Sequence, residues 1–270
     1  YNEALSYAKD RKQFDTAIIR FPAVYDMLSR MKAKLDAGRS ILYQTARYVD
    51  IYKALDDIAR ERKLTAEERQ EQKKYARLAD AFTPLAKGMN SEYANQNAYD
   101  AIQVHGGSGF IMEYKCQRLY RDARIFSIYE GTTQLQVVAA IRYITNGTYM
   151  GMIKDMLERE VADSMKALKV RVALMAEKLE DAVNAVKEAG SQELQDFVAR
   201  RLYEMTADTI MSLLILDDAT RSPQLFEKSA NVYVRYAEAE VNAHHSFIKS
   251  LRAEDLEYYR QAEKEAETEE

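Results

Sequence analysis

The amino-acid sequence predicts an all-α protein. Its 270 residues include only three prolines and nine glycines, the two residue types that most often interrupt helices. Alanine, leucine, lysine, glutamate and arginine, which favour helices, are abundant. Apolar residues also recur every three or four positions along most of the chain, as they do on the buried face of a helix. We therefore expect helical bundles with a sizeable core.

Charge and cysteine content narrow the class of protein further. A net charge of −4 argues against nucleic-acid binding, which requires a basic face. The single cysteine, Cys116, excludes an intrachain disulfide and favours a reducing compartment, so we expect a cytoplasmic protein. With only three histidines, we expect no metal site. No apolar run reaches the roughly 20 residues that are needed to cross a bilayer.

The first residues fit the middle of a helix. Tyr1 opens directly into an amphipathic pattern, with no capping residue and no initiator methionine before it. We therefore interpret the chain as a piece of a longer protein, and the absence of a targeting segment then carries little information. The first helix is expected to end near Asp10.

Residues 1 to 148 are expected to form an up-and-down four-helix bundle. The second helix begins near Phe21-Pro22, because proline suits a first helical turn, and a polar break follows it from residue 60 to residue 72. The third helix begins at the capping signal Thr65-Ala66-Glu67-Glu68 and ends at Gly106, with Pro84 expected to kink or divide it. The fourth helix begins after Gly131. The apolar stripes are Val24, Met27, Leu28, Met31, Leu35, Leu42 and Val49 in the second helix, and Leu135, Val138 and Ile141 in the fourth.

Residues 149 to 270 are expected to form a second bundle of three or four helices, packed on the first. Ala189-Gly190-Ser191 marks a turn, and Ser222-Pro223 restarts the chain with serine as N-cap and proline at the first helical position. The last helix is expected to run to about Leu251, and an acidic tail follows over residues 263–270. The stripes that form the core are Met165, Leu168, Val172, Met175, Leu179, Val183 and Val186, and then Leu194, Val198, Leu202, Met205, Thr209, Leu213 and Leu216.

Two short segments carry residues that are suited to chemistry. Glu130 lies between two apolar residues and Gly131, so its carboxylate could act as a general base with an open approach for substrate. Gly106 and Gly107 end a helix and could expose backbone N–H groups to a ligand. Both segments also have ordinary explanations. Acidic residues favour the start of a helix, and glycines often form the turns between helices.

Three segments resemble, in the same order, motifs of the acyl-CoA dehydrogenase family. The matching residues are Asp10-Arg11-Lys12-Gln13-Phe14, then Gln103 with Gly106, Gly107, Gly109 and Phe110, then Arg121-Asp122-Ala123 with Ile128-Tyr129-Glu130-Gly131-Thr132 and Gln134. The resemblance spans residues 1 to about 145. The extra residues after Gly151 make the chain similar to a longer bacterial branch with an added C-terminal helical domain.

The resemblance implies that Glu130 is the catalytic base. In the family, this glutamate removes the α-proton of an acyl-CoA thioester while the β-hydride passes to FAD, and the product is the trans-2-enoyl-CoA. The backbone N–H of the same glutamate helps to polarise the thioester carbonyl. Tyr129 and Gly131, which flank the base, are expected to contact the substrate.

The resemblance also implies that FAD is shared between the subunits of a homo-oligomer, either a dimer or a tetramer. An electron-transfer flavoprotein is the expected electron acceptor. The residues assigned to a neighbouring subunit's FAD are Arg11, Gln13 and Phe14 near its pyrophosphate, and Gln103, Gly106 and Gly107 at its adenosine end. Thr132 and Gln134 are assigned to the FAD of their own active site.

A few positions depart from the family pattern or lie outside it. Asp15 and Pro22 occupy positions where glycine and glutamine are usual. His105 occupies a position where an apolar residue is common, so we expect it to be packed and not catalytic. His244-His245 is expected at the surface or an interface. Two alternatives stay open, an acyl-CoA oxidase of the same fold and a helical oligomerisation module without catalytic activity. The isolated chain, which lacks the domains that hold most of the flavin, is expected to be inactive.

Overall fold

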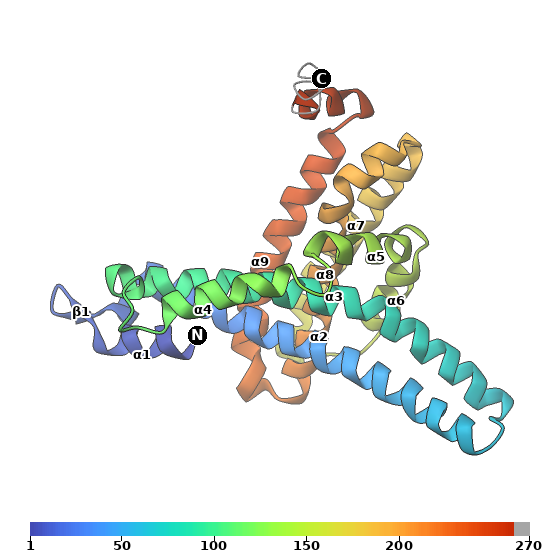
Figure 1. Ribbon diagram of the computed structural model, residues 1–270, viewed down its shortest axis with the longest axis horizontal. Coiled ribbons are helices and arrows are strands. Elements are labelled where there is room, and N and C mark those ends of the chain that lie inside the picture. Colours follow the sequence, from blue (N-terminus) through green and yellow to red (C-terminus); the bar gives the residue numbers. More distant parts are fainter. Residues whose placement is uncertain (262–270) are drawn as a thin grey trace.

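The computed structural model describes residues 1–261 and is almost entirely helical, which confirms the predicted fold class (Figure 1). The acidic tail predicted for residues 263–270 lies outside the described residues. Within the described part, no helix combines the length and apolar character needed to cross a membrane. The α-helices are α1 (Asn2–Asp10), α2 (Pro22–Glu61), α3 (Ala66–His105), α4 (Cys116–Ala123), α5 (Thr133–Thr145), α6 (Thr148–Leu157), α7 (Lys166–Ala189), α8 (Gln192–Arg221) and α9 (Pro223–Ser250). The 3₁₀ helices are η1 (Ile18–Arg20), η2 (Gly106–Gly109), η3 (Arg124–Ser127), η4 (Asp163–Met165) and η5 (Ala253–Tyr259), and β1 (Lys12–Gln13) pairs with β2 (Thr16–Ala17) in an antiparallel hairpin.

Helices α2 and α3 form a long hairpin whose turn is shorter than predicted. Only residues 62–65 are non-helical, because Thr65 and Glu68 form the predicted capping box and start α3 at once. Pro84, which was predicted to kink or divide the third helix, does not divide it, since α3 continues through it. Pro84 is buried beside the fully buried Phe82 and Leu85, and this packing outweighs the local preference of proline.

The buried faces of α2 and α5 differ in part from the predicted stripes, although Leu28 and Met31 of α2 are buried as predicted. Leu42 is 50% exposed, and Leu135 and Val138 are 57% and 58% exposed. The core-facing side of α2 instead carries Ala33, Ala37, Ile41 and Thr45, and that of α5 carries Val137, Ala140, Tyr143 and Ile144. Both helices have apolar residues on more than one face, so periodicity alone could not decide which face is buried.

The predicted stripes of the second segment are all buried, on α7 with the preceding Met165 and on α8. Gly190 ends α7 with a left-handed backbone (φ +62°), as expected for a glycine after a helix. Pro223 occupies the first turn of α9 as predicted, and Ser222 is its N-cap residue. The side chain of Ser222, however, makes no capping hydrogen bond.

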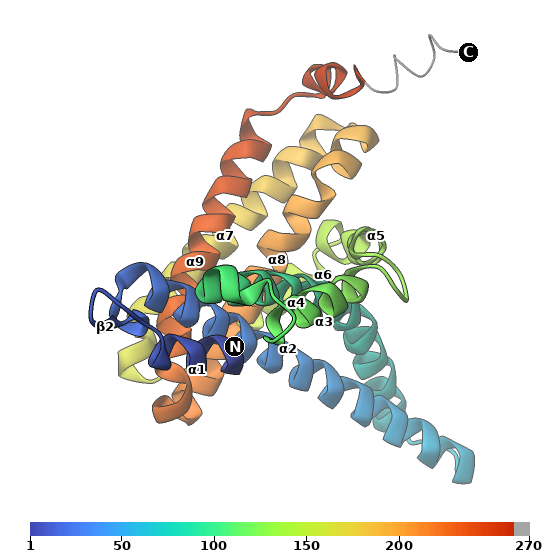
Figure 2. The same cartoon turned by 60° about the vertical axis from the view of Figure 1, so that its left-hand side comes forward.

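Helices α7, α8 and α9 run side by side and cross the α2–α3 hairpin (Figures 1 and 2). One hydrophobic core connects them, because it contains Ile41 of α2 and Leu85 of α3 as well as Val172 of α7 and Leu213 of α8. A smaller apolar cluster lies under α1 and includes Cys116. The far end of the α2–α3 hairpin projects beyond the rest of the molecule in both views.

Candidate active site

The loop that contains Glu130 has an unusual backbone. It connects η3 to α5, and Glu130 and Gly131 both have positive φ angles, +50° and +91°. A residue with a side chain rarely adopts such an angle, which costs on the order of 1–3 kcal/mol and persists only where the surroundings enforce it. The Glu130 side chain is exposed. Among the described residues, none accepts a hydrogen bond from its backbone N–H.

Contacts from α3 and α5 hold this loop on both sides of Glu130. The Lys87 Nζ of α3 donates a hydrogen bond of 2.6 Å to the Gly131 carbonyl, and Gln136 Nε2 donates a second of 3.3 Å to the same oxygen. The Lys87 ammonium also lies 5.7 Å from the centre of the Tyr129 ring, within the range of a cation–π interaction. Thr132 Oγ1 accepts a hydrogen bond from the Leu135 backbone N–H and so caps α5.

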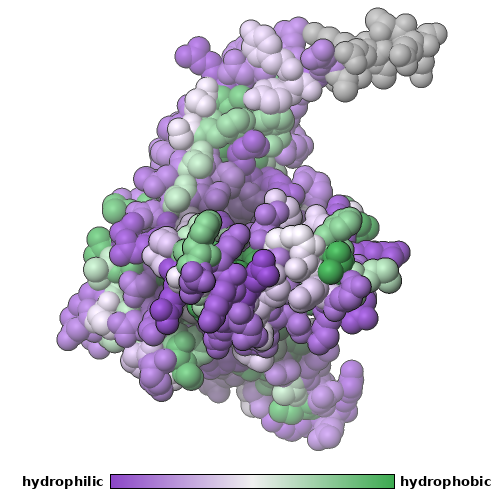
Figure 3. Space-filling view, turned by 90° about the vertical axis from the view of Figure 1, so that its left-hand side faces the viewer, coloured by the Kyte–Doolittle hydropathy of each residue, from purple (hydrophilic) through white to green (hydrophobic). Residues whose placement is uncertain are grey.

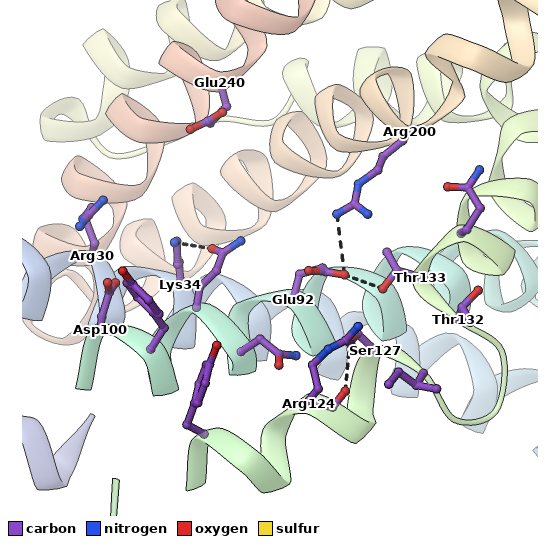
Figure 4. Close-up of a pocket in the computed structure, with 16 residues that line it drawn as sticks. Arg30, Lys34, Glu92, Asp100, Arg124, Ser127, Thr132, Thr133, Arg200 and Glu240 are labelled. Atoms are coloured by element: carbon purple, nitrogen blue, oxygen red, sulfur yellow. Dashed lines mark hydrogen bonds and ion pairs between the residues drawn. The ribbon is translucent and has the colours of Figure 1, made fainter. Parts of the chain in front are cut away.

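A wide cavity of about 800 Å³ lies beside this loop, between α2, α3, α5, α8 and α9. Thr132 and Gln134, the two residues assigned to the cofactor of their own site, both line it. Figure 4 shows a chain of polar contacts along its wall, in which Arg200 of α8 lies 3.7 Å from Glu92 of α3, and Glu92 accepts a 2.6 Å hydrogen bond from Thr133. Helix α8 thus supports the start of α5 through Glu92 of α3.

A smaller hollow of about 220 Å³ shares part of this wall and reaches towards the core. Asp208 of α8 lies there, and its Oδ1 accepts hydrogen bonds from the hydroxyls of Tyr93 (3.2 Å) and Tyr233 (3.0 Å). The two hydroxyls are 2.8 Å apart. Burial raises the pKa of the Asp208 carboxyl to about 7, although the hydrogen bond from Tyr233 opposes this shift.

The structure also shows the surroundings of the three histidines. His105 is 5% exposed, stacks on Tyr7 at 4.2 Å between ring centres, and has Cys116 Sγ 3.5 Å from its Nδ1, so it is packed as predicted. His244 pairs with Glu204 at 3.0 Å, and His245 with Asp181 at 2.7 Å. Within residues 1–261, no group of three or more histidine, cysteine or acidic side chains is arranged to hold a metal ion.

Gln13 and Phe14 lie on the β1–β2 hairpin and Arg11 directly precedes it, at the end of the molecule shown on the left of Figure 1. All three are exposed, and Phe14 is 87% exposed. Phe14 and Asp15 form the two-residue turn, with φ angles of +50° and +59°. Glycine is favoured at such positions, and aspartate tolerates them better than most residues. This tolerance accounts for Asp15 where the family pattern has glycine.

The glycine turn after α3 lies at the same end of the molecule. Tyr7 of α1 donates a hydrogen bond to Ser108 and stacks on His105, so α1 packs against this turn. Gly106 has φ +60° and ψ −141°, which residues with side chains do not adopt readily. A Cβ at Gly109 would lie 2.9 Å from the Ile102 carbonyl oxygen, so the fold itself requires this glycine. Gly107 differs from both, because its φ is not positive and a Cβ there would meet nothing within 4 Å.

The predicted site residues therefore fall into two groups. Lys87, which contacts the Glu130 loop, and Gln103 are sixteen residues apart in α3, so they lie about 24 Å apart along the helix axis. Exposed apolar side chains flank the glycine turn, with Phe110 80% and Met112 87% exposed. Figure 3 views this end and shows hydrophobic patches separated by hydrophilic side chains.

The sequence did not point to Lys87, Glu92, Gln136 or Arg200, because no local pattern relates them to the Glu130 loop.

Two family models match the chain. The model described as "Acyl-CoA dehydrogenase, C-terminal domain" matches residues 1–144, and the one described as "Acyl-CoA dehydrogenase C terminal" matches residues 145–256. Over 135 residues, the chain is 38% identical to the caffeyl-CoA reductase–Etf complex subunit CarC of Acetobacterium woodii. That alignment covers 50% of this chain and 29% of the relative. It is also 38% identical, over 145 residues, to the 3-methylmercaptopropionyl-CoA dehydrogenase of Ruegeria pomeroyi, with coverage of 50% and 23%. The 3-(aryl)acrylate reductase of Clostridium sporogenes is 36% identical over 135 residues, 50% of this chain and 29% of that protein.

Solved structures share the fold. An acyl-CoA dehydrogenase from Bacillus anthracis, complexed with FAD, superposes with a TM-score of 0.69 at 22% identity, and the match covers 91% of this chain and 45% of that one. ACDH-11 from Caenorhabditis elegans, in complex with C11-CoA, gives 0.64 at 20% identity, covering 87% and 39%. The chain thus spans less than half of each of these proteins, and the sequence matches span less than a third of each relative.

Proposed function

The chain belongs to the acyl-CoA dehydrogenase family, and we propose that it is the C-terminal helical part of a flavin-dependent enzyme in which Glu130 is the catalytic base. The backbone of the Glu130 loop is the observation that carries this proposal. Glu130 has a φ of +50° between two anchored neighbours, and such strain collects at active sites. The occurrence of Glu130-Gly131-Thr132 together with the glycine turn at Gly106-Gly107 also argues against a helical module without catalytic activity, which would need neither motif.

In the proposed reaction, the Glu130 carboxylate takes the α-proton of an acyl-CoA thioester. The electron pair of that C–H bond forms the α,β double bond, and the β-hydrogen leaves with its own pair as hydride. FAD, when bound, supplies the hydride acceptor. The backbone N–H of Glu130, which no described residue engages, is available to hydrogen bond to the thioester carbonyl and stabilise the developing negative charge. The product is the trans-2-enoyl-CoA.

The residues assigned to FAD are suited to such a group. Gly107 has no need of glycine for its own conformation or packing, so the missing side chain leaves the backbone open to a ligand. The exposed Arg11 guanidinium suits a pyrophosphate. Thr133, beside Thr132, contacts Glu92 of α3, which is eleven residues, or about 16 Å, along the helix from Gln103. This separation is in keeping with contacts to two different FAD molecules, one in each of two subunits of a homo-oligomer.

A reductase that runs the same chemistry in reverse is the second candidate. Two of the relatives are named caffeyl-CoA reductase–Etf complex subunit and 3-(aryl)acrylate reductase. Glu130 would then donate a proton to the α-carbon of an enoyl substrate, and reduced FAD, when bound, would supply the hydride for the β-carbon. The first of these names also supports an electron-transfer flavoprotein as the redox partner. An acyl-CoA oxidase is the remaining alternative, and it would transfer the electrons to oxygen.

Replacing Glu130 with glutamine in the full-length flavoprotein tests this proposal. Glutamine keeps the shape of the side chain but removes the basic carboxylate, so we expect flavin reduction by acyl-CoA to slow by about a hundred- to ten-thousand-fold, while acyl-CoA affinity changes little. The measurement is anaerobic flavin bleaching in a stopped-flow spectrometer. Three additions to the reduced enzyme would separate the candidate activities. Reoxidation of the flavin by an electron-transfer flavoprotein indicates a dehydrogenase, reoxidation by oxygen an oxidase, and reoxidation by an enoyl-CoA a reductase.

Glu188→Gln is the matched control, because Glu188 is an exposed glutamate near the end of α7. We expect this variant to reduce its flavin at the wild-type rate. If Glu130→Gln also did so, the base would lie elsewhere, and the proposed role of Glu130 would be wrong.

A further inference from the structure

Lys87 contacts the residues on both sides of Glu130. Its Nζ donates a 2.6 Å hydrogen bond to the Gly131 carbonyl, and its charge lies 5.7 Å from the centre of the Tyr129 ring. Neither a hydrogen bond nor an ion pair links Lys87 to Glu130 itself. Any influence of the lysine on the carboxylate must therefore act through the shape of the loop.

The surroundings of Lys87 suit a fixed support. Its neighbours in α3 are buried, with Leu85 0%, Ala86 6% and Met89 5% exposed, so the backbone that carries it is held firmly by the core. Among the described residues, no carboxylate lies within 4.0 Å of its ammonium. The charge of this half-buried group is instead directed at a peptide carbonyl and a ring face. Lys87 is thus committed to the loop and does not form a salt bridge.

The hydrogen bond fixes the peptide plane between Gly131 and Thr132, the second peptide after Glu130. Two successive positive φ angles set the course of the loop from Glu130 to the Gly131 carbonyl. Lys87 holds that carbonyl on one side and the Tyr129 ring on the other, so it restrains the backbone that carries the Glu130 side chain. Gln136 also donates to the carbonyl, at the longer distance of 3.3 Å. A charged donor forms the stronger hydrogen bond, so Lys87 is the principal support and Gln136 the lesser one.

We propose that Lys87 is a positioning residue that holds Glu130 in its working orientation. This inference rests on the proposed function of Glu130. A catalytic group that is misplaced by about 1 Å can lose on the order of a hundred-fold in rate. Lys87 thus acts on the rate of proton transfer and has little effect on the binding of substrate.

The test compares Lys87→Met and Lys87→Arg in the full-length flavoprotein. Methionine keeps the apolar stem but donates no hydrogen bond. We expect it to slow flavin reduction at saturating acyl-CoA by about 10- to 100-fold, while the Kd of an enoyl-CoA product changes by less than about three-fold. Arginine keeps a charged donor, and we expect it to restore at least half of the lost rate on a logarithmic scale. FAD content and the thermal midpoint are measured for both variants.

Lys154→Met is the matched control, since Lys154 of α6 pairs with Glu180 of α7 and not with the Glu130 loop. The rate of this variant should be unchanged. The proposal is wrong if Lys87→Met reduces its flavin at the wild-type rate, or if it loses affinity for the enoyl-CoA and keeps its rate. It is also wrong if arginine restores FAD content and the thermal midpoint but no rate. Glu130→Gln is measured in parallel to separate the two proposals. If Glu130→Gln reduces its flavin at the wild-type rate, Glu130 is not the base. If Glu130→Gln is slow and Lys87→Met is as fast as wild type, Glu130 remains the proposed base and only the positioning role of Lys87 is wrong.

Discussion

Glu130 and Asp208 are two carboxylates that the fold places in opposite environments. Glu130 is exposed on a short loop and has a strained backbone. Asp208 is 5% exposed on a regular helix, and two tyrosine hydroxyls donate hydrogen bonds to it. The pKa of Asp208 is raised to about 7 because burial disfavours its charge.

The contrast separates two possible signs of a catalytic residue, a raised pKa and a strained backbone. A raised pKa in a hollow is a common sign of catalysis, yet the partners of Asp208 come from α3 and α9 and join the two segments that match different family models. Its hydrogen bonds are those of an internal structural cluster. At Glu130 the backbone is the unusual feature, and the side chain faces outward. We therefore expect Asp208 to govern stability and Glu130 to govern chemistry.

The pH dependence of unfolding gives the largest effect on stability. The pKa of Asp208 is about 7 in the folded protein and has an ordinary value of 3.8. The folded state thus binds the proton more tightly, and its stability falls as pH rises from about 4 to 7. The full loss is on the order of 4 kcal/mol above pH 7. Asp208→Asn carries no titrating proton, so we expect the difference in unfolding free energy between variant and wild type to shift in favour of the variant by about that amount between pH 4 and pH 8.

Urea denaturation at several pH values measures this difference, and taking it relative to wild type removes the contribution of the other titrating groups. A difference that stayed constant from pH 4 to pH 8 would show that Asp208 does not titrate in this range. Flavin reduction by acyl-CoA in the Asp208→Asn enzyme should stay at the wild-type rate, because the hydrogen bonds of Asp208 go to Tyr93 and Tyr233 and not to the Glu130 loop. A large loss of rate without a loss of stability would break the contrast with Glu130.

Removing one tyrosine hydroxyl tests the same cluster with a smaller effect. Tyr233→Phe deletes a 3.0 Å hydrogen bond to Asp208 and leaves a buried carboxyl with one fewer donor. Such a loss costs about 1–3 kcal/mol, and because that bond lowers the pKa of Asp208, the pKa should rise further. Urea denaturation at pH 7 gives the cost. Tyr258→Phe is the control, since Tyr258 is 83% exposed, and an equal cost in both variants would argue against the cluster.

Long-range packing explains which parts of the fold the sequence could predict. Helices α7, α8 and α9 were predictable because α7 and α8 carry buried apolar residues at helical spacing and because clear end signals, such as Gly190 and Pro223, separate the helices. Helix α5 was misjudged because Leu135 and Val138 form an apolar line next to the buried line of Val137 and Ala140. Only the position of α3 and α8 decides between these lines. Strands of two residues, as in the β1–β2 hairpin, are too short to leave a periodic pattern.

The candidate site divides in the same way. Glu130, Gly131 and the glycine turn could be named as candidates because their motifs are contiguous in the sequence. The support from Lys87 was not, since 44 residues separate it from Gly131 and a lysine in a helix is ordinarily solvated. The sequence also could not distinguish the role of Gly107 from that of Gly109. That distinction depends on how closely the Ile102 backbone approaches.

Two glycine substitutions give the smallest effect and sharpen the contrast within the predicted site. Gly131 has φ +91°, and an added Cβ would lie 3.0 Å from Gln136 Nε2. We expect Gly131→Ala to cost about 1–2 kcal/mol of stability and to slow flavin reduction, because the strained loop would relax. At Gly107 the φ angle is not positive and an added Cβ would meet nothing within 4 Å. The unfolding free energy of Gly107→Ala should therefore stay within about 0.5 kcal/mol of wild type. Its effect should fall instead on FAD affinity in the oligomer, because the new methyl group would occupy the approach to the backbone. Urea denaturation and FAD titration of both variants separate these effects. If Gly107→Ala bound FAD as tightly as wild type, no cofactor would approach that turn closely, and the assignment of Gly107 to a neighbouring subunit's FAD would be wrong.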